Sequence, residues 1–305
     1  MAGLLEGRAV LITGSGGGIG REHALAFARA GASVVVNDPG VSLDGHGSNH
    51  DPADAVVAEI VASGGVAVAN YDSVADHASA GRIVDVARQH FGRLDIVVNN
   101  ASVFHGVLFD EMTEQQWDDQ LGVHVKGAFN VCKHALPMMV ERSWGRIINT
   151  SSASAFGGVG FAAYSTSKAA LLGFTYALAA EYWRHGITVN AILPNAGTEH
   201  RLVEGAQWME RVASRGFVPP GAGEAPPPPH FVPPLVIHLA SDAGGEISGK
   251  VFDVGGGHVG VYPHPATAAA MDKPMESGPW TQSELLGTLP SVLESTGTRA
   301  PGVGS

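Results

Sequence analysis

The sequence contains too few cysteines, basic residues and long apolar runs for several classes of protein. A single cysteine, Cys132, among 305 residues excludes an internal disulfide and suits a reducing compartment. The 18 lysines and arginines against 29 acidic residues give a net charge of −11, which excludes a nucleic-acid-binding footprint. The longest apolar run, residues 169–180, is too short to span a bilayer. The N-terminus lacks the order of a signal peptide, and the C-terminal PGVGS is no peroxisomal address. We therefore expect a cytoplasmic protein that binds neither nucleic acid nor membranes, with Cys132 in its core.

Short β-branched runs alternate with longer helical patterns along most of the chain. Buried strands are expected at residues 8–13, 32–37, 66–70, 95–100, 146–151, 188–193 and 251–255. Helices are expected at residues 19–30, 52–63, 74–91, 113–142, 164–185 and 233–241. Asp51 is expected to cap the second helix, with Pro52 in its first position. Because continuous apolar strands separated by helices indicate a parallel sheet covered on both faces, the sequence predicts a doubly wound, Rossmann-type α/β domain of about seven strands.

The last third of the chain interrupts this alternation twice. Residues 216–230 are proline-rich and are expected to form a linker within a lid region of about 198–234. Residues 261–305 are expected to form a tail whose single short helix starts at the capping box Thr281–Glu284. We therefore divide the chain into a domain of residues 1–260 and a C-terminal extension.

The first expected strand runs into the glycine-rich stretch TGSGGGIG, residues 13–20, which leads into a helix. Its spacing fits T-G-x-x-x-G-x-G through Gly14, Gly18 and Gly20, whereas G-x-G-x-x-G would need a glycine at Ile19. Glycines at these positions let the backbone turn tightly and approach a pyrophosphate, whose charge the helix N-terminus favours. Such a stretch also fits an ordinary tight turn, so a dinucleotide site needs further support.

That support comes from Asp38, which ends the second expected strand twenty residues after Gly18. A carboxylate there can accept hydrogen bonds from both adenosine ribose hydroxyls and repels a 2′-phosphate. No arginine or lysine follows it closely, which favours NAD over NADP as the cofactor. The alternative is that Asp38 only starts the turn Asp38-Pro39-Gly40.

Tyr164 and Lys168 lie four residues apart, on one face of an expected helix. A free phenol has a pKa of about 10, and a nearby ammonium brings it towards the range of a base at neutral pH. Ser151 lies at the end of an expected parallel strand, where ligands bind in open α/β sheets, so its hydroxyl can hold a substrate oxygen beside Tyr164. Tyr-x-x-x-Lys alone is a common accident, but with the serine and the nucleotide loop it indicates a catalytic site.

Together these motifs resemble the short-chain dehydrogenase/reductase family over roughly residues 5–260. The matching stretches are TGSGGGIG (13–20), NNAS (99–102), NTSSAS (149–154), YSTSK (164–168) and SGKVFDVGGG (248–257). The resemblance implies that Tyr164 is the acid/base, that Ser151 positions the carbonyl or hydroxyl, and that Lys168 holds the nicotinamide ribose and tunes Tyr164. It also implies that Asn99 links the sheet to the cofactor and that Asp72 contacts adenine. The full set of expected cofactor contacts is Gly14, Gly18, Ile19, Gly20, Asp38, Asp72, Ser73, Asn99, Ala101, Tyr164, Lys168, Pro194, Ala196 and Thr198.

Three positions depart from the usual pattern of the family. His124, in LGVHVKG (121–127), stands where the family carries a catalytic asparagine that helps to hold a water in the proton relay. A histidine can take over through its ring, can leave the task to backbone groups, or can be a satisfied structural residue. The NNAG motif ends here in Ser102, and the usual Pro-Gly after the sixth strand is Pro194-Asn195. We include His124 as a fourth candidate catalytic residue.

The chain resembles one subgroup of this family in four places, namely His124, PNAG (194–197), the long loop 37–54 and ANYDSV (69–74). It comprises the (3R)-hydroxyacyl-CoA dehydrogenase regions of peroxisomal multifunctional enzymes type 2 and their free-standing bacterial relatives. The resemblance implies a homodimer or homotetramer that interconverts a secondary alcohol and a ketone with NAD, favouring a fatty or steroid-derived 3-hydroxyacyl-CoA. Alternatives are a hydroxysteroid or other lipophilic alcohol dehydrogenase, and a 3-oxoacyl-carrier-protein reductase, which Asp38 disfavours. A non-catalytic NAD-binding regulator is a further alternative, although its usual mark is loss of Ser151, Tyr164 or Lys168.

Three further groups of residues have ordinary as well as functional interpretations. Asp44, His46, His50 and Asp51 fit no common metal spacing, so we expect no metal site and a solvated loop instead. Arg201, Arg211 and Arg215 follow the sixth strand and either meet CoA phosphates or form a solvated helix face. Trp208 and Met209 either line an acyl pocket or pack the lid against the domain.

Overall fold

The computed structural model describes residues 3–42, 47–217 and 225–296, with the side chains of 199–204 and 207 left aside. The chain divides into two compact units, Met1–Tyr262 and Pro263–Ser305. The strands of the first unit are β1 (Ala9–Thr13), β2 (Ser33–Asn37), β3 (Val66–Asn70), β4 (Ile96–Asn99), β5 (Gly145–Thr150), β6 (Ile187–Pro194), β7 (Val251–Gly255) and β8 (His258–Tyr262). Its helices are α1 (Gly18–Arg29), α2 (Asp51–Ala62), α3 (His77–Phe91), α4 (Glu114–Leu121), α5 (Gly127–Arg142), α6 (Ala162–Tyr182), α7 (Glu199–Ser214) and α8 (Pro233–Ala240).

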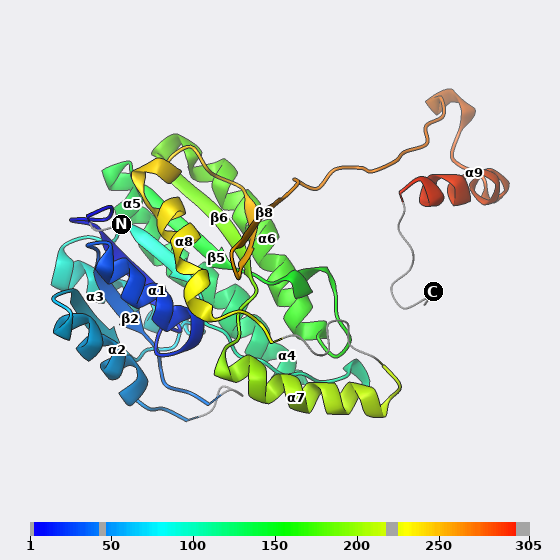
Figure 1. Cartoon of the computed structure of the whole chain (residues 1–305). Helices are drawn as coiled ribbons and strands as arrows, with labels where there is room; N and C mark the ends of the chain where they lie inside the picture. The colour runs from blue at the N-terminus through cyan, green and yellow to red at the C-terminus, as the bar shows by residue number, and fades with distance from the viewer. Residues whose placement is uncertain (1–2, 43–46, 218–224, 297–305) are drawn as a thin grey trace. The chain divides into compact units, whose positions relative to one another are not determined.

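The eight strands form one sheet in the order β3-β2-β1-β4-β5-β6-β7-β8 (Figure 1). The neighbouring pairs from β3 to β7 are parallel, and β8 pairs antiparallel with β7. The strand order reverses between β1 and β4, and in open α/β sheets a ligand binds at the carboxyl ends of the strands at such a point. The predicted doubly wound fold is confirmed.

Helices cover both faces of the sheet. Side chains alternate across β1, where Val10 and Ile12 pack with α1, α2 and α8, while Leu11 packs with α3, α5 and α6. Figure 1 shows α1 and α8 side by side on the first of these faces. All three of these β1 residues are fully buried, as expected of a parallel strand covered on both sides.

The structure differs from three of the sequence-based expectations. The expected helix 113–142 is interrupted by a π-helical turn, Gly122–Lys126, because an inserted residue in an i→i+5 turn leaves the apolar periodicity almost unchanged. The short edge strand β8 was not expected, since its glycine and histidine are poor strand signals. The second helix begins at Asp51 itself, and Asn49 accepts the N–H of Asp51 through its side chain at 3.0 Å.

The second unit contains one longer helix, α9 (Gln282–Ser295), preceded by the expected capping box. Thr281 and Glu284 bond each other's backbone N–H groups, and Lys273 adds an ion pair to Glu284 at 2.9 Å. No residue of α9 is buried, and Leu286 and Leu293 expose 69% and 53% of their surfaces. The unit therefore has local caps but no core of its own around this helix.

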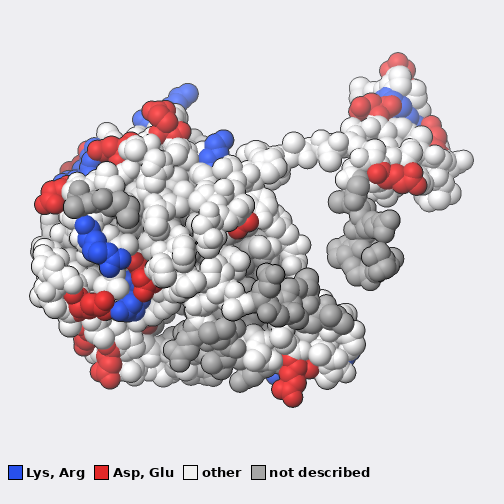
Figure 2. Space-filling view, in the orientation of Figure 1, with Lys and Arg blue, Asp and Glu red and all other residues white. Residues whose placement is uncertain are grey.

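Acidic and basic side chains are interspersed on the face seen in Figure 2 and do not gather into a field of one sign. Within the described residues, no helix combines the length and the apolar character that a membrane crossing requires.

Candidate active site

The glycine-rich loop between β1 and α1 is closed too tightly for side chains. A Cβ on Gly14, which has φ of +63°, would lie 2.7 Å from Cα of Ala101, and one on Gly20 would lie 2.1 Å from the carbonyl oxygen of Gly14. The N-cap of α1, Gly17, makes no side-chain cap, and the first turn contains no acidic residue. The N–H groups at the start of α1 therefore remain available to an anion, which fits the pyrophosphate of a dinucleotide.

The loop after β6 lies against the same glycines. Gly18 has φ of +51°, and a Cβ there would lie 3.2 Å from Cγ2 of Thr198. Ala196 is 3% exposed, whereas Pro194 and Thr198 are half-buried. Ile19 packs against the core beneath α1. Of the expected cofactor contacts, Pro194 thus ends β6, and Ala196 and Thr198 follow in the loop, where Thr198 lies against the start of α1.

Asp38 joins the glycine loop to the end of β2. Its Oδ2 accepts the N–H of Gly16 at 2.8 Å, and its Oδ1 accepts the N–H of Gly40 at 2.8 Å. One oxygen therefore starts the Asp38–Gly40 turn while the other bonds to the glycine loop, and the binding of ribose hydroxyls by Asp38 stays a prediction. The bonds fix the carboxylate and leave it further lone pairs for ribose hydroxyls.

Asp72 lies beyond the end of β3, where it is bonded within the chain. Its Oδ1 accepts a hydrogen bond from Nε of Arg82, and its Oδ2 accepts one from the Asn70 amide, both at 3.0 Å. Ser73 accepts the N–H of Ala75 at 3.3 Å. The structure thus brings Asp72 and Ser73 to the carboxyl edge of the sheet and supplies Asp72 with a cationic partner, Arg82, that the sequence analysis did not anticipate.

Two residues that the sequence analysis left without a role hold the loop after β4. Oγ1 of Thr13 accepts the N–H groups of Asn100 and Ala101, each at 3.0 Å. The Asn100 amide donates to the carbonyl oxygens of Thr13 and Gly14, each at 2.9 Å. Thr13 lies in the motif TGSGGGIG and Asn100 in the motif NNAS. The presence of a polar side chain in each motif was the signal by which the sequence could have pointed to these residues. They clamp the two strands on either side of the point where the strand order reverses.

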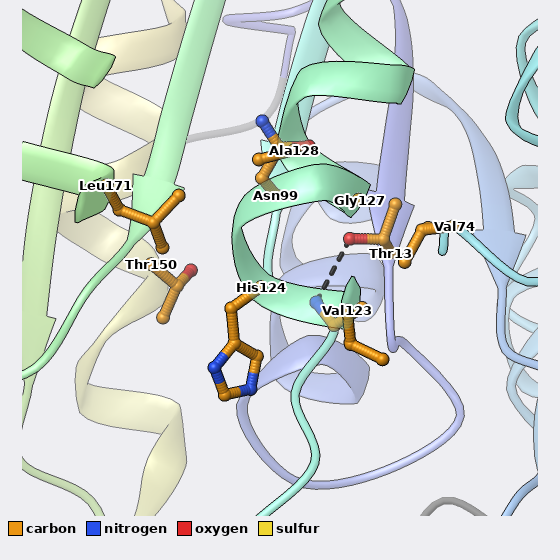
Figure 3. A pocket seen from close by; sticks show the side chains of 10 residues that line it. Thr13, Val74, Asn99, Val123, His124, Gly127, Ala128, Thr150 and Leu171 are labelled. Atoms are coloured by element: carbon orange, nitrogen blue, oxygen red, sulfur yellow. Dashed lines mark hydrogen bonds between the residues drawn. The ribbon is translucent and has the colours of Figure 1, made fainter. Parts of the chain in front are cut away.

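Asn99 lies deeper, at the end of β4. Its amide donates to Oδ1 of Asn149 at 2.8 Å and to Sγ of Cys132 at 3.3 Å. Cys132 is buried in the core, as expected, and this burial raises the pKa of its thiol to about 12. Oδ1 of Asn99 and Oγ1 of Thr150 are buried and have no hydrogen-bond partner among the described residues. Both side chains line the pocket in Figure 3, together with Ala101 and His124.

Ser151, Tyr164 and Lys168 meet where β5 ends and α6 begins. The hydroxyl of Ser151 donates to the backbone carbonyl of Lys168 at 2.7 Å, and Nζ of Lys168 donates to the carbonyl of Thr150 at 3.0 Å. Nζ also lies 5.4 Å from the centre of the Tyr164 ring. The three candidate catalytic residues therefore lie together as one unit. Hydrogen bonds join the segments of Ser151 and Lys168, both of which are 2% exposed, and the ring of the half-buried Tyr164 lies beside Lys168.

The electrostatics of this unit depend on Lys168. Burial lowers the pKa of its ammonium to about 7, because the charged form loses its hydration. A neighbouring anion would reverse this shift, and the nearest candidates are a phenolate at Tyr164 and a phosphate of a bound dinucleotide. Lys168 can therefore exchange its proton close to neutral pH, or stabilise an anion formed beside it.

His124 lies in the π-helical turn and is 2% exposed. Its Nε2 lies 2.9 Å from Oγ of Ser102 and accepts the N–H of Val103 at 3.1 Å. Its Nδ1 lies 2.7 Å from Oγ of Ser167. The histidine and the serine that depart from the family pattern are therefore direct partners, beside Tyr164.

An aromatic wall borders the phenol. The rings of Phe104 and Phe161 stand edge to face with Tyr164, with centroid distances of 5.2 and 6.1 Å. Trp208 of α7 stacks on Phe161 at 4.7 Å and donates from its indole to the carbonyl of Val159 at 2.8 Å. Trp208 therefore fastens the lid helix to the loop before α6 and extends an apolar surface away from the catalytic unit.

The remaining candidates lie outside this unit. Arg215 pairs with Asp110 and Glu111, and Arg211 reaches the carbonyl of Gly106 at 3.5 Å. Met209 is 38% exposed, and the side chain of Arg201 is outside the described part of the chain. No cluster of three metal-ligating side chains occurs in residues 3–42, 47–217 and 225–296, and Asp44 and His46 fall outside these ranges. His50 instead stacks on Tyr71 at 3.7 Å.

Residues 8–202 match the family model of the short chain dehydrogenases, and this chain belongs to that family. The resemblance identified from the motifs is thereby confirmed, and membership of the family implies oxidoreductase chemistry with a nicotinamide cofactor. The glycine-rich loop and the start of α1 fit such a cofactor on steric and electrostatic grounds.

Comparison with individual relatives shows which members of the family this chain is similar to. The hydroxyacyl-CoA dehydrogenase ChsB1 of Mycobacterium tuberculosis is 33% identical over 294 residues, 93% of this chain and 88% of the relative. The peroxisomal multifunctional enzyme type 2 of Mus musculus is 42% identical over 257 residues, 84% of this chain, which spans only 32% of that enzyme. The crystal structure of a short chain dehydrogenase from Mycobacterium avium matches with a TM-score of 0.80 and 38% identity over 98% of both chains.

Proposed function

We propose that the protein is an NAD-dependent dehydrogenase of secondary alcohols and that its substrate is a 3-hydroxyacyl-CoA, fatty or steroid-derived. The observation that carries this proposal is the grouping of Ser151, Tyr164 and Lys168 at the carboxyl edge of the sheet, where hydrogen bonds join the segments of Ser151 and Lys168 and Nζ of Lys168 lies 5.4 Å from the centre of the Tyr164 ring. It stands beside a glycine loop that fits a dinucleotide.

In the proposed reaction, the phenolate of Tyr164 accepts the proton of the substrate hydroxyl and becomes the neutral phenol. Ser151 hydrogen-bonds the substrate oxygen and keeps it beside the phenol. Lys168 stabilises the phenolate through its charge and binds the nicotinamide ribose. A nicotinamide held by the glycine loop and Lys168 would supply the acceptor for the hydride of the carbinol carbon, while the protein supplies orientation and electrostatics.

The preference for NAD rests on Asp38. Its carboxylate is fixed beside the glycine loop by the N–H groups of Gly16 and Gly40. A 2′-phosphate at the same place would bring a second negative charge next to it, and residues 39–50 contain no lysine or arginine to offset that repulsion. Asn99 and Asp72 are assigned to the sheet–cofactor link and the adenine end respectively.

The CoA thioester is favoured by the names of similar proteins, among them the ChsB1 dehydrogenase of Mycobacterium tuberculosis. The apolar wall of Phe104, Phe161 and Trp208 suits a lipophilic acyl or steroid group. Arg215 is already paired with two carboxylates, so it supports a fixed lid more than a phosphate site. The same apolar wall also favours a second candidate, a dehydrogenase of free hydroxysteroids.

The test is NADH formation by the purified protein with NAD⁺ or NADP⁺ and a panel of secondary alcohols. The panel contains (3R)- and (3S)-hydroxyacyl-CoAs of several chain lengths, free hydroxysteroids and simple alcohols. Turnover of a (3R)-acyl-CoA with NAD⁺ only is the expected result. Turnover of free steroids without any acyl-CoA activity would replace the substrate, and preference for NADP⁺ would overturn the role of Asp38.

Two further expectations concern the protein in the cell. We propose a homodimer or homotetramer in the cytoplasm. The assembly is supported by apolar side chains that the described residues of the first unit expose, such as Phe109, Phe129 and Phe156. Light scattering on the purified full chain measures the mass directly, and a monomeric mass at micromolar concentration would contradict the assembly.

A further inference from the structure

The imidazole of His124 is engaged on both ring nitrogens inside the fold. Val103 donates its backbone N–H to Nε2, and Ser102 approaches the same nitrogen. An N–H can donate only to a ring nitrogen without a proton, so Nε2 is the acceptor and the neutral ring has its proton on Nδ1. The hydrogen-bond pattern therefore fixes the tautomer.

The pattern continues from His124 to the helix that carries Tyr164. The hydroxyl of Ser167 donates to the backbone carbonyl of Tyr164 at 2.9 Å, which leaves its oxygen to accept the Nδ1–H of His124 at 2.7 Å. The hydrogen bonds thus run in one direction, from the loop after β4, through the imidazole, to the first turn of α6.

The same ring also touches the phenol. The centroids of His124 and Tyr164 are 5.6 Å apart with an interplanar angle of 85°, and Phe104 meets Tyr164 at 5.2 Å and the same angle. Phe104 follows directly on Ser102 and Val103, so one short loop both orients the imidazole and supplies the second ring against the phenol. Packing and hydrogen bonding together restrict the phenol to one orientation.

We propose that His124 is a positioning residue, which fixes the orientation of the Tyr164 phenol by joining the Ser102–Val103 loop to Ser167, and that it carries no proton during turnover. Both nitrogens are committed to protein groups, so neither is available to pass a proton onward. The inference rests on the acid/base role proposed above for Tyr164.

The charges around the ring favour the same protonation state. Burial is the main cause that holds the pKa of His124 well below its usual range, and the nearby Lys168 and His105 act in the same direction. The hydrogen bond from Val103 acts in the opposite direction and does not overcome them. The neutral form of the ring is therefore favoured at neutral pH.

The kinetic test compares Ser167→Ala and His124→Phe with Thr166→Ala, a matched control whose exposed side chain lies on the same turn of α6. We expect kcat to fall about tenfold or more in the first two variants, with KM for NAD⁺ and the shape of the kcat–pH profile unchanged. The double variant should be no slower than His124→Phe alone, because both changes break one connection. Thr166→Ala should keep the wild-type kcat.

Three results would overturn the inference: unchanged kcat in both variants, multiplicative effects in the double variant, or loss of an ionisation from the kcat–pH profile of His124→Gln. A second measurement needs no turnover and separates this inference from the proposed function. Two-bond ¹H–¹⁵N spectra of the wild-type protein, with His124→Gln for assignment, should show the proton on Nδ1 throughout pH 5–9. A proton on Nε2, or an imidazolium that titrates in this range, would refute the tautomer even if no substrate were known.

Discussion

The hydroxyl oxygen of Ser102 lies 2.9 Å from Nε2 of His124, although the two residues are 22 positions apart in the chain. Each is a departure from the usual sequence of the family, and the fold brings them together. Ser102 follows β4, and His124 lies in the π-helical turn before α5. Because one supplies a partner to the other, a substitution at either position changes the surroundings of Tyr164 through the same ring.

The glycine loop gives a first prediction with a matched control. Gly14→Ala should abolish NAD⁺ binding, because the added Cβ would lie 2.7 Å from the backbone of Ala101 and φ at this position is +63°. Gly173→Ala should leave binding unchanged, since nothing lies within 4 Å of that Cβ inside α6. Calorimetric titration with NAD⁺ measures both, and equal affinities for the two variants would contradict the role of the loop.

Asp38 gives a prediction about cofactor choice. Asp38→Ala should weaken NAD⁺ binding by roughly tenfold to a hundredfold, the usual effect of losing hydrogen bonds to a charged group, while binding of NADP⁺ is less affected or improves. Asp51→Asn, an exposed carboxylate at the start of α2, serves as the control and should change neither. The measurement is the dissociation constant of each dinucleotide. An unchanged ratio between the two constants in Asp38→Ala would contradict the role of Asp38 in cofactor choice.

Lys168 gives a prediction about stability and pH. Its pKa in the folded protein is about 7 against 10.5 when it is not buried, so the unfolded chain binds the proton more tightly between these values. The folded state should therefore gain stability as pH rises from 7, by about 2 kcal/mol at pH 8.5, and Lys168→Met should lack this gain. Urea unfolding at both pH values measures it. If the free energy of unfolding changed with pH by the same amount in both proteins, burial would not shift the pKa of Lys168.

His23 gives a trend of the same sign in the acid range. It is fully buried in α1, and burial lowers its pKa to about 3, so protonation between pH 6.5 and 3 favours the unfolded chain. The wild-type protein should lose about 2 kcal/mol of unfolding free energy between pH 6.5 and 5 through this group, and His23→Leu should lose less. His90→Leu, on the exposed side of α3, should behave as the wild type in denaturant unfolding at the two pH values. If His23→Leu were as acid-sensitive as the wild type, this cause would be excluded.

Most of the fold could be predicted from the sequence because its signals are local. The runs ending at Thr13, Asn37 and Thr150 are apolar and β-branched, and the glycines after Thr13 are required by their positions. The site was predicted only as separate motifs. That Thr13 and Asn100 clamp the loop after β4, that Arg82 reaches Asp72, and that Ser102 meets His124 are contacts between distant segments, which no local pattern encodes. The π-helical turn escaped for a different reason, since one inserted residue hardly changes an apolar period.

The central claim is that Tyr164 is the acid/base of a dinucleotide-dependent dehydrogenase, and the most direct measurement is turnover by Tyr164→Phe. The substitution removes one oxygen and keeps the ring that packs against His124 and Phe104. We predict that NADH formation from the best substrate of the panel falls by roughly 10²- to 10⁴-fold, while NAD⁺ binds as in the wild type. Wild-type turnover by this variant, with cofactor binding intact, would contradict the account.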